Sequence, residues 1–209
     1  MPAIETLLVF TAAAMVMNLS PGPSNFYVLA RSLEQGPGAG IVAALGLAIG
    51  SLVHVFAAAF GLSLLFAAAP LLYTGLKFIG AAYLIYLGIR TFLAKVEPGI
   101  SIESLGRSRG SILRESVLVE VLNPKTALFF IAFLPQFVDA KLPMAPQFLL
   151  LGLIVTLTAV PCDVAVAVGA GKAARWLRGS TKVRRWQNRV SGGILVTLGA
   201  YVAFGTRQN

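Results

Sequence analysis

Three ionisable side chains interrupt long apolar segments, and they are the residues best placed to do chemistry. Lys125, Glu120 and Asp163 are each flanked by stretches with few other charges. A charge at membrane depth is costly, so it is retained where it binds a substrate, carries a proton or meets an opposite charge. Lys125 is therefore expected to bind a substrate carboxylate or to belong to a proton-coupled ion pair. The alternative is a structural charge that balances Asp163 or Glu120.

The same reasoning gives alternatives for the acidic residues and for the single histidine. Asp163, which follows the helix breaker Pro161, can bind a substrate amino group, carry a proton or neutralise Lys125. Glu120 has the same three options and a fourth, contact with cytoplasmic lipid headgroups. His54 is a candidate proton relay because histidine titrates near neutral pH, but a hydrogen bond across helices is the favoured alternative.

Two proline-containing breaks offer backbone groups beside these charges. Proline removes a backbone donor, and a helix that restarts after it presents free N–H groups that favour an anion. Broken helices at matching positions in two halves of a chain point to a transporter's binding site. The expected ligand is a zwitterion held by a restarting helix and by free carbonyls or Asp163. The predicted substrate-binding residues are Pro21, Gly22, Pro23, Ser24, Asn25, Asn123, Pro124 and Lys125.

The composition indicates what surrounds these residues. Of the 209 residues, 57% are hydrophobic and 12% are charged, and the mean hydropathy is +0.81. About a quarter of the residues are charged in a soluble domain, and roughly 20 apolar residues cross a bilayer as a helix. The chain is therefore predicted to be an all-α integral membrane protein whose first apolar stretch is retained as a helix. The six expected spans are residues 5–30, 40–66, 71–93, 112–138, 146–170 and 189–206.

The two halves of the chain, about 1–95 and 111–209, carry similar motifs in the same order when Ser20-Pro21 is aligned with Asn123-Pro124. Three spans in each half is an odd number, so the second half is inverted relative to the first. The sequence thus predicts one transmembrane domain, residues 1–209, formed by a 3+3 inverted repeat with broken helices 1 and 4. Glycines at small-residue spacing are expected to pack helices rather than to touch substrate; they are Gly36, Gly40, Gly46 and Gly50.

The net charge of +9 comes from basic residues that are unevenly distributed between the two sides of the predicted membrane protein. Thirteen Lys and Arg residues flank or fill the connections on one side, mainly the loops at about 94–111 and 172–188, and two lie on the other side. Because basic loops stay in the cytoplasm, both termini are expected outside. Contact with lipid headgroups explains the same charges, so the bilayer is the expected partner and nucleic acid is not.

The sequence lacks the residue patterns expected for metal binding, ATP binding or enzymatic catalysis. One His, one Cys and two Asp do not make a metal site, no GxxxxGK(S/T) loop is present to bind ATP, and no Ser/His/Asp order suggests an enzyme. No cofactor is expected. Two competing functions are a membrane scaffold that binds a partner through the basic loops and an exporter of metal cations, for which the spans hold few carboxylates and sulfurs.

Several motifs together resemble a known family in their order and spacing, over nearly the whole chain. The family is the LysE/RhtB group of lysine and homoserine–threonine exporters, which are bacterial amino-acid efflux proteins. The motifs are Pro21-Gly22-Pro23, Tyr27-Val28-Leu29-Ala30-Arg31-Ser32 with Gly36 and Gly40, Ala44-Leu45-Gly46-Leu47-Ala48-Ile49-Gly50, Leu122-Asn123-Pro124-Lys125, residues 129–138, and Asp163.

The resemblance implies a secondary exporter of small amino acids or their derivatives. It also implies six helices, a proton driving force, the bacterial cytoplasmic (inner) membrane and a homodimer. Some lysine-exporting members carry an acidic residue after the glycine of span 2, where this chain has Ser51 after Gly50. The Val53-His54 pair resembles the homoserine/threonine branch, so a neutral amino acid is the expected substrate.

Overall fold

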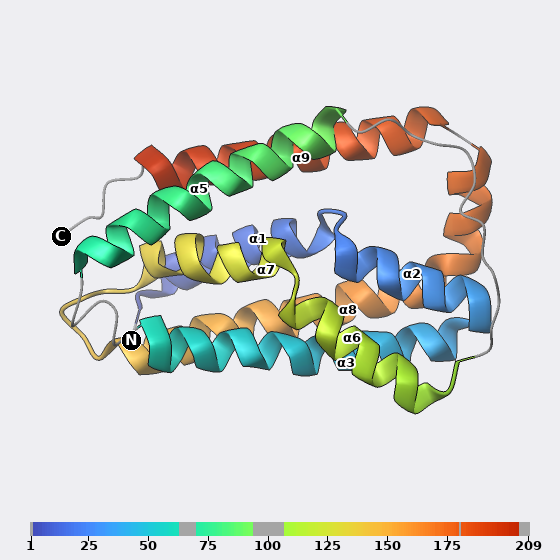
Figure 1. The fold of residues 1–209 in the computed structure, drawn as a ribbon, viewed down its shortest axis with the longest axis horizontal. Helices are drawn as coiled ribbons and strands as arrows, with labels where there is room; N and C mark the ends of the chain where they lie inside the picture. The colour runs from blue at the N-terminus through green and yellow to red at the C-terminus, as the bar shows by residue number, and fades with distance from the viewer. Residues whose placement is uncertain (1, 63–69, 94–106, 180, 205–209) are drawn as a thin grey trace.

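The computed structural model describes residues 2–62, 70–93, 107–179 and 181–204, and the regular elements within these ranges are all helices. Helices α5 and α9 lie side by side along one face, α3, α6 and α8 lie on the opposite face, and α1, α2 and α7 lie between them (Figure 1). The helices in chain order are α1 (Ile4–Leu19), α2 (Pro23–Gln35), α3 (Pro37–Phe56), η1 (Ala57–Leu62), α5 (Pro70–Leu93), α6 (Arg109–Val121), α7 (Pro124–Leu128), η2 (Phe129–Phe133), η3 (Leu134–Phe137), α8 (Met144–Gly179) and α9 (Thr181–Phe204).

Two to four of the described elements are candidate membrane spans by length and composition. The segments Pro37–Leu62 and Met144–Ala170 are each long and apolar enough to cross a bilayer alone. The pair α1 and α2 is bent by 50° at its break, and α6 with the helical run Pro124–Phe137 is bent by 41°. Each bent pair passes the same criteria as one broken span. A helix break is therefore present at each of the two positions that the sequence predicts.

The two breaks are formed by prolines that begin the second helix of each pair. Pro23 and Pro124 occupy the first turn of α2 and α7, where the missing N–H costs nothing. Gly22 and Asn123 precede them as the capping residues. The equivalent dipeptides are thus Gly22-Pro23 and Asn123-Pro124, two residues away from the alignment on Pro21. Sequence similarity alone did not show which proline takes the first helical position.

Pro161 does not break its helix, contrary to the expectation from the sequence. It lies inside α8, which runs without interruption from Met144 to Gly179. Proline is tolerated inside a membrane helix where surrounding groups satisfy the freed backbone. Asp163 is consequently carried by a continuous helix and not by a restarting one.

Glycines bring the helices into close contact. A Cβ on Gly46 would lie 2.6 Å from the Leu113 carbonyl of α6, and one on Gly50 would lie 2.8 Å from the Val117 carbonyl. These two residues of α3 pack helices, as the sequence predicts. Gly36 has a different role. It forms the turn between α2 and α3 with a φ of 83°, a backbone angle that favours glycine.

Helix α5 packs mainly against α9, and two glycines allow the approach. A Cβ added to Gly192 would lie 2.5 Å from the Gly88 carbonyl oxygen and 2.6 Å from the Phe92 amide nitrogen. Both are backbone atoms, so neither can rotate away. A Cβ on the adjacent Gly193 would meet nothing within 4 Å.

Gly192→Ala is expected to lower stability by about 1–3 kcal/mol because α5 and α9 must separate to admit the methyl group. Gly193→Ala is the matched control, since the chemistry and the helix are the same and the added methyl group meets open space. The midpoint of thermal unfolding in detergent should fall for the first variant and stay or rise for the second. Equal midpoints would contradict this packing.

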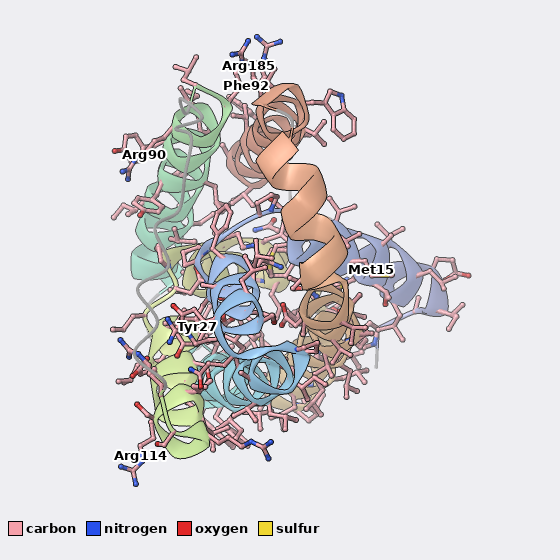
Figure 2. All side chains as sticks on the ribbon, turned by 90° about the vertical axis from the view of Figure 1, so that its right-hand side faces the viewer. Met15, Tyr27, Arg90, Phe92, Arg114 and Arg185 are labelled. Carbon is pink, nitrogen blue, oxygen red and sulfur yellow. The ribbon has the colours of Figure 1, made fainter. Side chains whose placement is uncertain are left out.

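Two side-chain clusters join the first half of the chain to the second at opposite ends of the molecule. At the end where α2 terminates, the Tyr27 hydroxyl donates to Glu115 Oε2 (3.0 Å), and Glu115 also accepts from Ser111 Oγ (2.9 Å) and pairs with Arg107. The Arg31 guanidinium lies 5.3 Å from the centre of the Tyr27 ring. We call these five residues the polar cluster; Figure 2 views the molecule from this end and labels Tyr27.

Aromatic side chains pack together at the opposite end. Phe10 of α1 lies against Phe129 and Phe137, with ring centres 6.0 and 5.1 Å apart. Phe133 bridges Phe129 and Phe137 at 4.8 and 5.1 Å. We call these four residues the aromatic cluster. The two ends therefore carry contacts of opposite chemistry, one polar and one apolar.

Candidate functional site

The two helix breaks meet at one pocket in the middle of the helical bundle. Its volume is about 30 Å³, which is room for roughly two water molecules. Six helices (α1, α2, α3, α6, α7 and α8) and Asn123 of the second break contribute to its wall, which carries one lysine and two carboxylates. The lining residues are Met17, Asn18, Ser24, Asn25, Leu47, Ala48, Ser51, Glu120, Asn123, Lys125, Thr126, Ala159, Val160 and Asp163.

Lys125 is held by carbonyl groups that the first break exposes. Its side chain is 3% exposed, and Nζ donates to the carbonyl oxygens of Ser20 (2.8 Å) and Met17 (3.3 Å). Both carbonyls lie at the C-terminal end of α1, where the helix dipole favours a cation. Lys125 forms no ion pair with Asp163 or Glu120, so the structural balance considered from the sequence is not a direct contact.

Gly22 makes room for this ammonium group. A Cβ at that position would lie 2.9 Å from Lys125 Nζ and 3.1 Å from Cε. The φ of Gly22 is −163°, which any residue adopts, so the glycine is needed for space and not for its backbone angle. The first break thus provides both the acceptors and the opening for the lysine of the second.

Glu120 ties the two breaks together. Its Oε2 accepts from Ser24 Oγ and, at 3.4 Å, from Asn123 Nδ2. Asn123 Nδ2 also donates to Ser24 Oγ (2.7 Å), while Asn123 Oδ1 accepts from the Lys125 amide (3.1 Å) and caps α7. Glu120 is buried in this network. It therefore points into the protein and not toward lipid headgroups.

Asp163 differs from Glu120 in having no fixed partner. It is 7% exposed and lines the pocket from α8. In the part of the chain that the structure describes, its carboxylate forms no hydrogen bond and no ion pair. A buried carboxylate without a partner is unusual, because desolvation of the charge is uncompensated.

His54 lies beside the pocket without lining it. Its Nε2 is 2.9 Å from the Glu120 carbonyl oxygen, and its ring centre is 5.7 Å from that of Phe130. The cross-helix hydrogen bond expected from the sequence is thus present. Pro21, Gly22, Pro23 and Pro124, which the sequence predicts to bind substrate, also stay outside the lining. They shape the breaks and provide no polar group to the pocket.

Part of the pocket wall was not predicted from the sequence. Leu47, Ala48 and Ser51 follow one face of α3, and Ala159 and Val160 line the pocket from α8. Helical spacing before Asp163 and along α3 is the only signal that could have found them. Among the described residues, no three His, Cys, Asp or Glu side chains gather as a metal site would require.

The free backbone N–H groups at the N-terminus of α2 are further polar groups at the pocket. No side chain caps this helix, and Ser24 and Asn25, which follow Pro23 in its first turn, both line the pocket. An uncapped helix N-terminus attracts an anion. The pocket therefore offers positive groups at the breaks and a free negative group on α8.

Comparison with known proteins gives relatives over nearly the full length. A membrane protein of unassigned function from Vibrio cholerae is 31% identical over 96% of this chain and 97% of its own length. A homoserine/homoserine lactone efflux protein of Salmonella typhimurium is 29% identical over 95% and 96%. A leucine efflux protein of Klebsiella pneumoniae is 30% identical over 94% and 93%.

No solved structure matches the chain significantly. The family described as "LysE type translocator" matches residues 15–206. This confirms the resemblance inferred from the broken-helix motifs and identifies an efflux-type membrane protein. The chain belongs to the LysE type translocator family.

Proposed function

We propose that the protein is a proton-driven secondary exporter of small neutral amino acids in the bacterial cytoplasmic membrane. The observation that carries this proposal is the meeting of two broken helices at a pocket with one lysine and two carboxylates. A zwitterion needs both signs of charge within a few ångströms, and broken helices supply them at membrane depth. The relatives named as homoserine and leucine efflux proteins support neutral substrates.

The proposed architecture is six spans in a 3+3 inverted repeat, with both termini outside. The helix contacts support it because they come in matching pairs. The second span of each half packs on the broken span of the other half: α3 on α6, and α8 on α1 and α2. The second spans also pack on each other, as do the third spans α5 and α9. A homodimer stays a prediction.

In the proposed complex, the substrate carboxylate binds the N-terminus of α2 beside Lys125. Its ammonium group binds the acidic side of the pocket. Its side chain lies along the apolar wall formed by Leu47, Ala48 and Val160. That wall favours short uncharged side chains, because a second charge there would be buried without a partner.

Transport by alternating access requires the polar and aromatic clusters to open in turn. The present pocket of about 30 Å³ is far smaller than a bound amino acid, so the structure corresponds to a closed state. The polar cluster lies at the end expected to face the cytoplasm, and the labelled Arg90, Arg114 and Arg185 point outward from the bundle in that view (Figure 2).

Counterflow in proteoliposomes tests the function directly. Purified protein is reconstituted with unlabelled homoserine, leucine or threonine inside, and the accumulation of the labelled amino acid is followed. Accumulation with at least one of them, and its absence from protein-free liposomes, is the expected result. No accumulation with any neutral amino acid, alongside a stable monodisperse protein, would favour a scaffold and contradict the proposal.

Labelling of single cysteines tests the topology. In a Cys162→Ala background, Ala140→Cys lies between η3 and α8, and Gly110→Cys lies in the first turn of α6; both positions are exposed. An impermeant maleimide should label position 140 in intact cells and position 110 only after permeabilisation, because basic loops stay inside. Labelling of both from outside would contradict the six-span arrangement.

A further inference from the structure

We infer that Asp163 is the single group at which the substrate's ammonium and the exchanged proton compete. The inference rests on the proposed function and assigns its coupling to one residue. The ligand class is a primary ammonium group on an α-amino acid. Each amino acid that binds displaces one proton from the carboxyl group, and each one that leaves is replaced by a proton.

The two pocket carboxylates differ in what they can still bind. Glu120 already accepts hydrogen bonds from Ser24 and Asn123. These two residues also bond to each other, so the Glu120 carboxylate is held in a network that joins both breaks. Asp163 is over nine-tenths buried, lines the pocket and has no hydrogen bond or ion pair among the described residues. A substrate ammonium can therefore reach Asp163 without breaking an existing contact.

The charged neighbours of Asp163 make no contact with it among the described residues. Glu120 and Lys125 are the ionisable groups of α6 and α7 that act on it through the pocket. Lys125 is committed to the carbonyls of Met17 and Ser20. On α2, the residues at the pocket, Ser24 and Asn25, are uncharged.

Among the described residues, the other titratable groups nearby are Cys162 on α8 itself and His54 on α3. The His54 Nε2 atom faces the Glu120 carbonyl oxygen and not Asp163. The Cys162 side chain is a thiol, which carries no charge that could pair with the carboxylate. A buried carboxylate that no donor or cation contacts is strongly disfavoured. In the closed state Asp163 must therefore carry either a proton or an ammonium partner, and it cannot hold both.

The exchange balances in protons and charge. On the cytoplasmic side, the Asp163 carboxyl group releases its proton to water and the carboxylate takes the ammonium group. On the outside, the ammonium leaves and the carboxylate takes a proton from water. One proton enters for each zwitterion exported, so the cycle moves one positive charge inward and is driven by both the pH gradient and the membrane potential.

The test measures proton release on binding, using purified full-length protein in weakly buffered detergent solution with a pH indicator. The probe is homoserine or leucine, whichever the wild type exchanges in counterflow. Wild-type protein should release about one proton per bound molecule, as a single competing site requires, and binding should weaken as the pH falls. Asp163→Asn should release none and bind independently of pH.

A second measurement uses a ligand that lacks the ammonium group, so that the protein keeps its carboxylate. The 2-hydroxy acid with the same side chain should bind wild type at least about 100-fold more weakly than the amino acid, because a buried charge pair is lost. In Asp163→Asn the two ligands should bind within about threefold of each other. A structural role for Asp163 would lower stability without removing this discrimination.

Two variants complete the test. Asp139→Asn makes the same change at a carboxylate outside the pocket and should release protons as wild type does. Asp163→Glu keeps the carboxylate and should still release a proton, with weaker binding. Proton release that persists in folded Asp163→Asn, or that disappears in Glu120→Gln instead, overturns the inference. Failure of wild type to exchange any neutral amino acid overturns the proposed function itself.

Discussion

Lys125→Met is expected to abolish export while leaving an inserted and folded protein. Methionine preserves the length of the side chain and removes the charge that the substrate carboxylate would meet beside α2. The carbonyls of Ser20 and Met17 lose their donor, which costs about 1–3 kcal/mol for a buried polar group. Initial export rates in proteoliposomes should fall at least about 100-fold, as for a truncated charge pair, with a modest drop in the unfolding midpoint.

Lys77→Met is the matched control, because it makes the same change on α5, away from the pocket lining. It should export at close to the wild-type rate. The double variant Lys125→Met/Asp163→Asn should stay inactive, since Lys125 is held by carbonyls and not by Asp163. Recovery of export in that double variant would mean that the lysine only balances the aspartate. Normal export by Lys125→Met would refute a role in transport.

Asn123→Asp is expected to produce the largest loss of stability. The new carboxylate keeps the acceptor that caps α7 but replaces the donor that serves Ser24 and Glu120. Two carboxylates would then face each other in a buried site, and an uncompensated buried charge costs about 3–5 kcal/mol. The unfolding midpoint in detergent should fall sharply, and export should be lost with it.

Glu120→Gln should rescue this variant because it exchanges donor and acceptor across the same contact. In the double variant, the glutamine amide donates to the new aspartate, and its carbonyl oxygen accepts from Ser24. A double-mutant cycle on the unfolding midpoint should therefore show strong positive coupling between the two positions. Additive losses would show that the Asn123–Glu120 contact does not join the breaks.

The sequence predicts the helical elements well where apolar length decides them. The expected span 71–93 matches α5, which runs from Pro70 to Leu93. The expected spans 146–170 and 189–206 are shorter than α8 and α9, which continue to Gly179 and begin at Thr181. A hydropathy pattern detects the apolar part of a helix and gives no sign of its polar continuation beyond the bilayer.

The gathering of the site residues was predictable, but their partners were not. The two bent helix pairs bring Ser24, Asn25 and Lys125 to one pocket, and all three were expected to share a site. That Lys125 binds carbonyls of α1, and that Glu120 pairs with Ser24, depends on contacts about 100 residues apart in the chain. Which of these distant residues meet depends on the angle at which the two breaks pack. Residue types alone do not predict that angle.

In the proposed alternating-access cycle, the polar and aromatic clusters would give the two opening steps different heat capacities. Opening the Tyr27 end exchanges protein hydrogen bonds for bonds to water, and exposed polar surface lowers the heat capacity. Opening the Phe10 end brings aromatic surface into water, which raises the heat capacity by about 0.45 cal/K/mol for each Å² exposed. The free-energy difference between the proposed inward-open and outward-open states would therefore vary non-linearly with temperature, so the ratio of their populations would differ between cold and warm conditions.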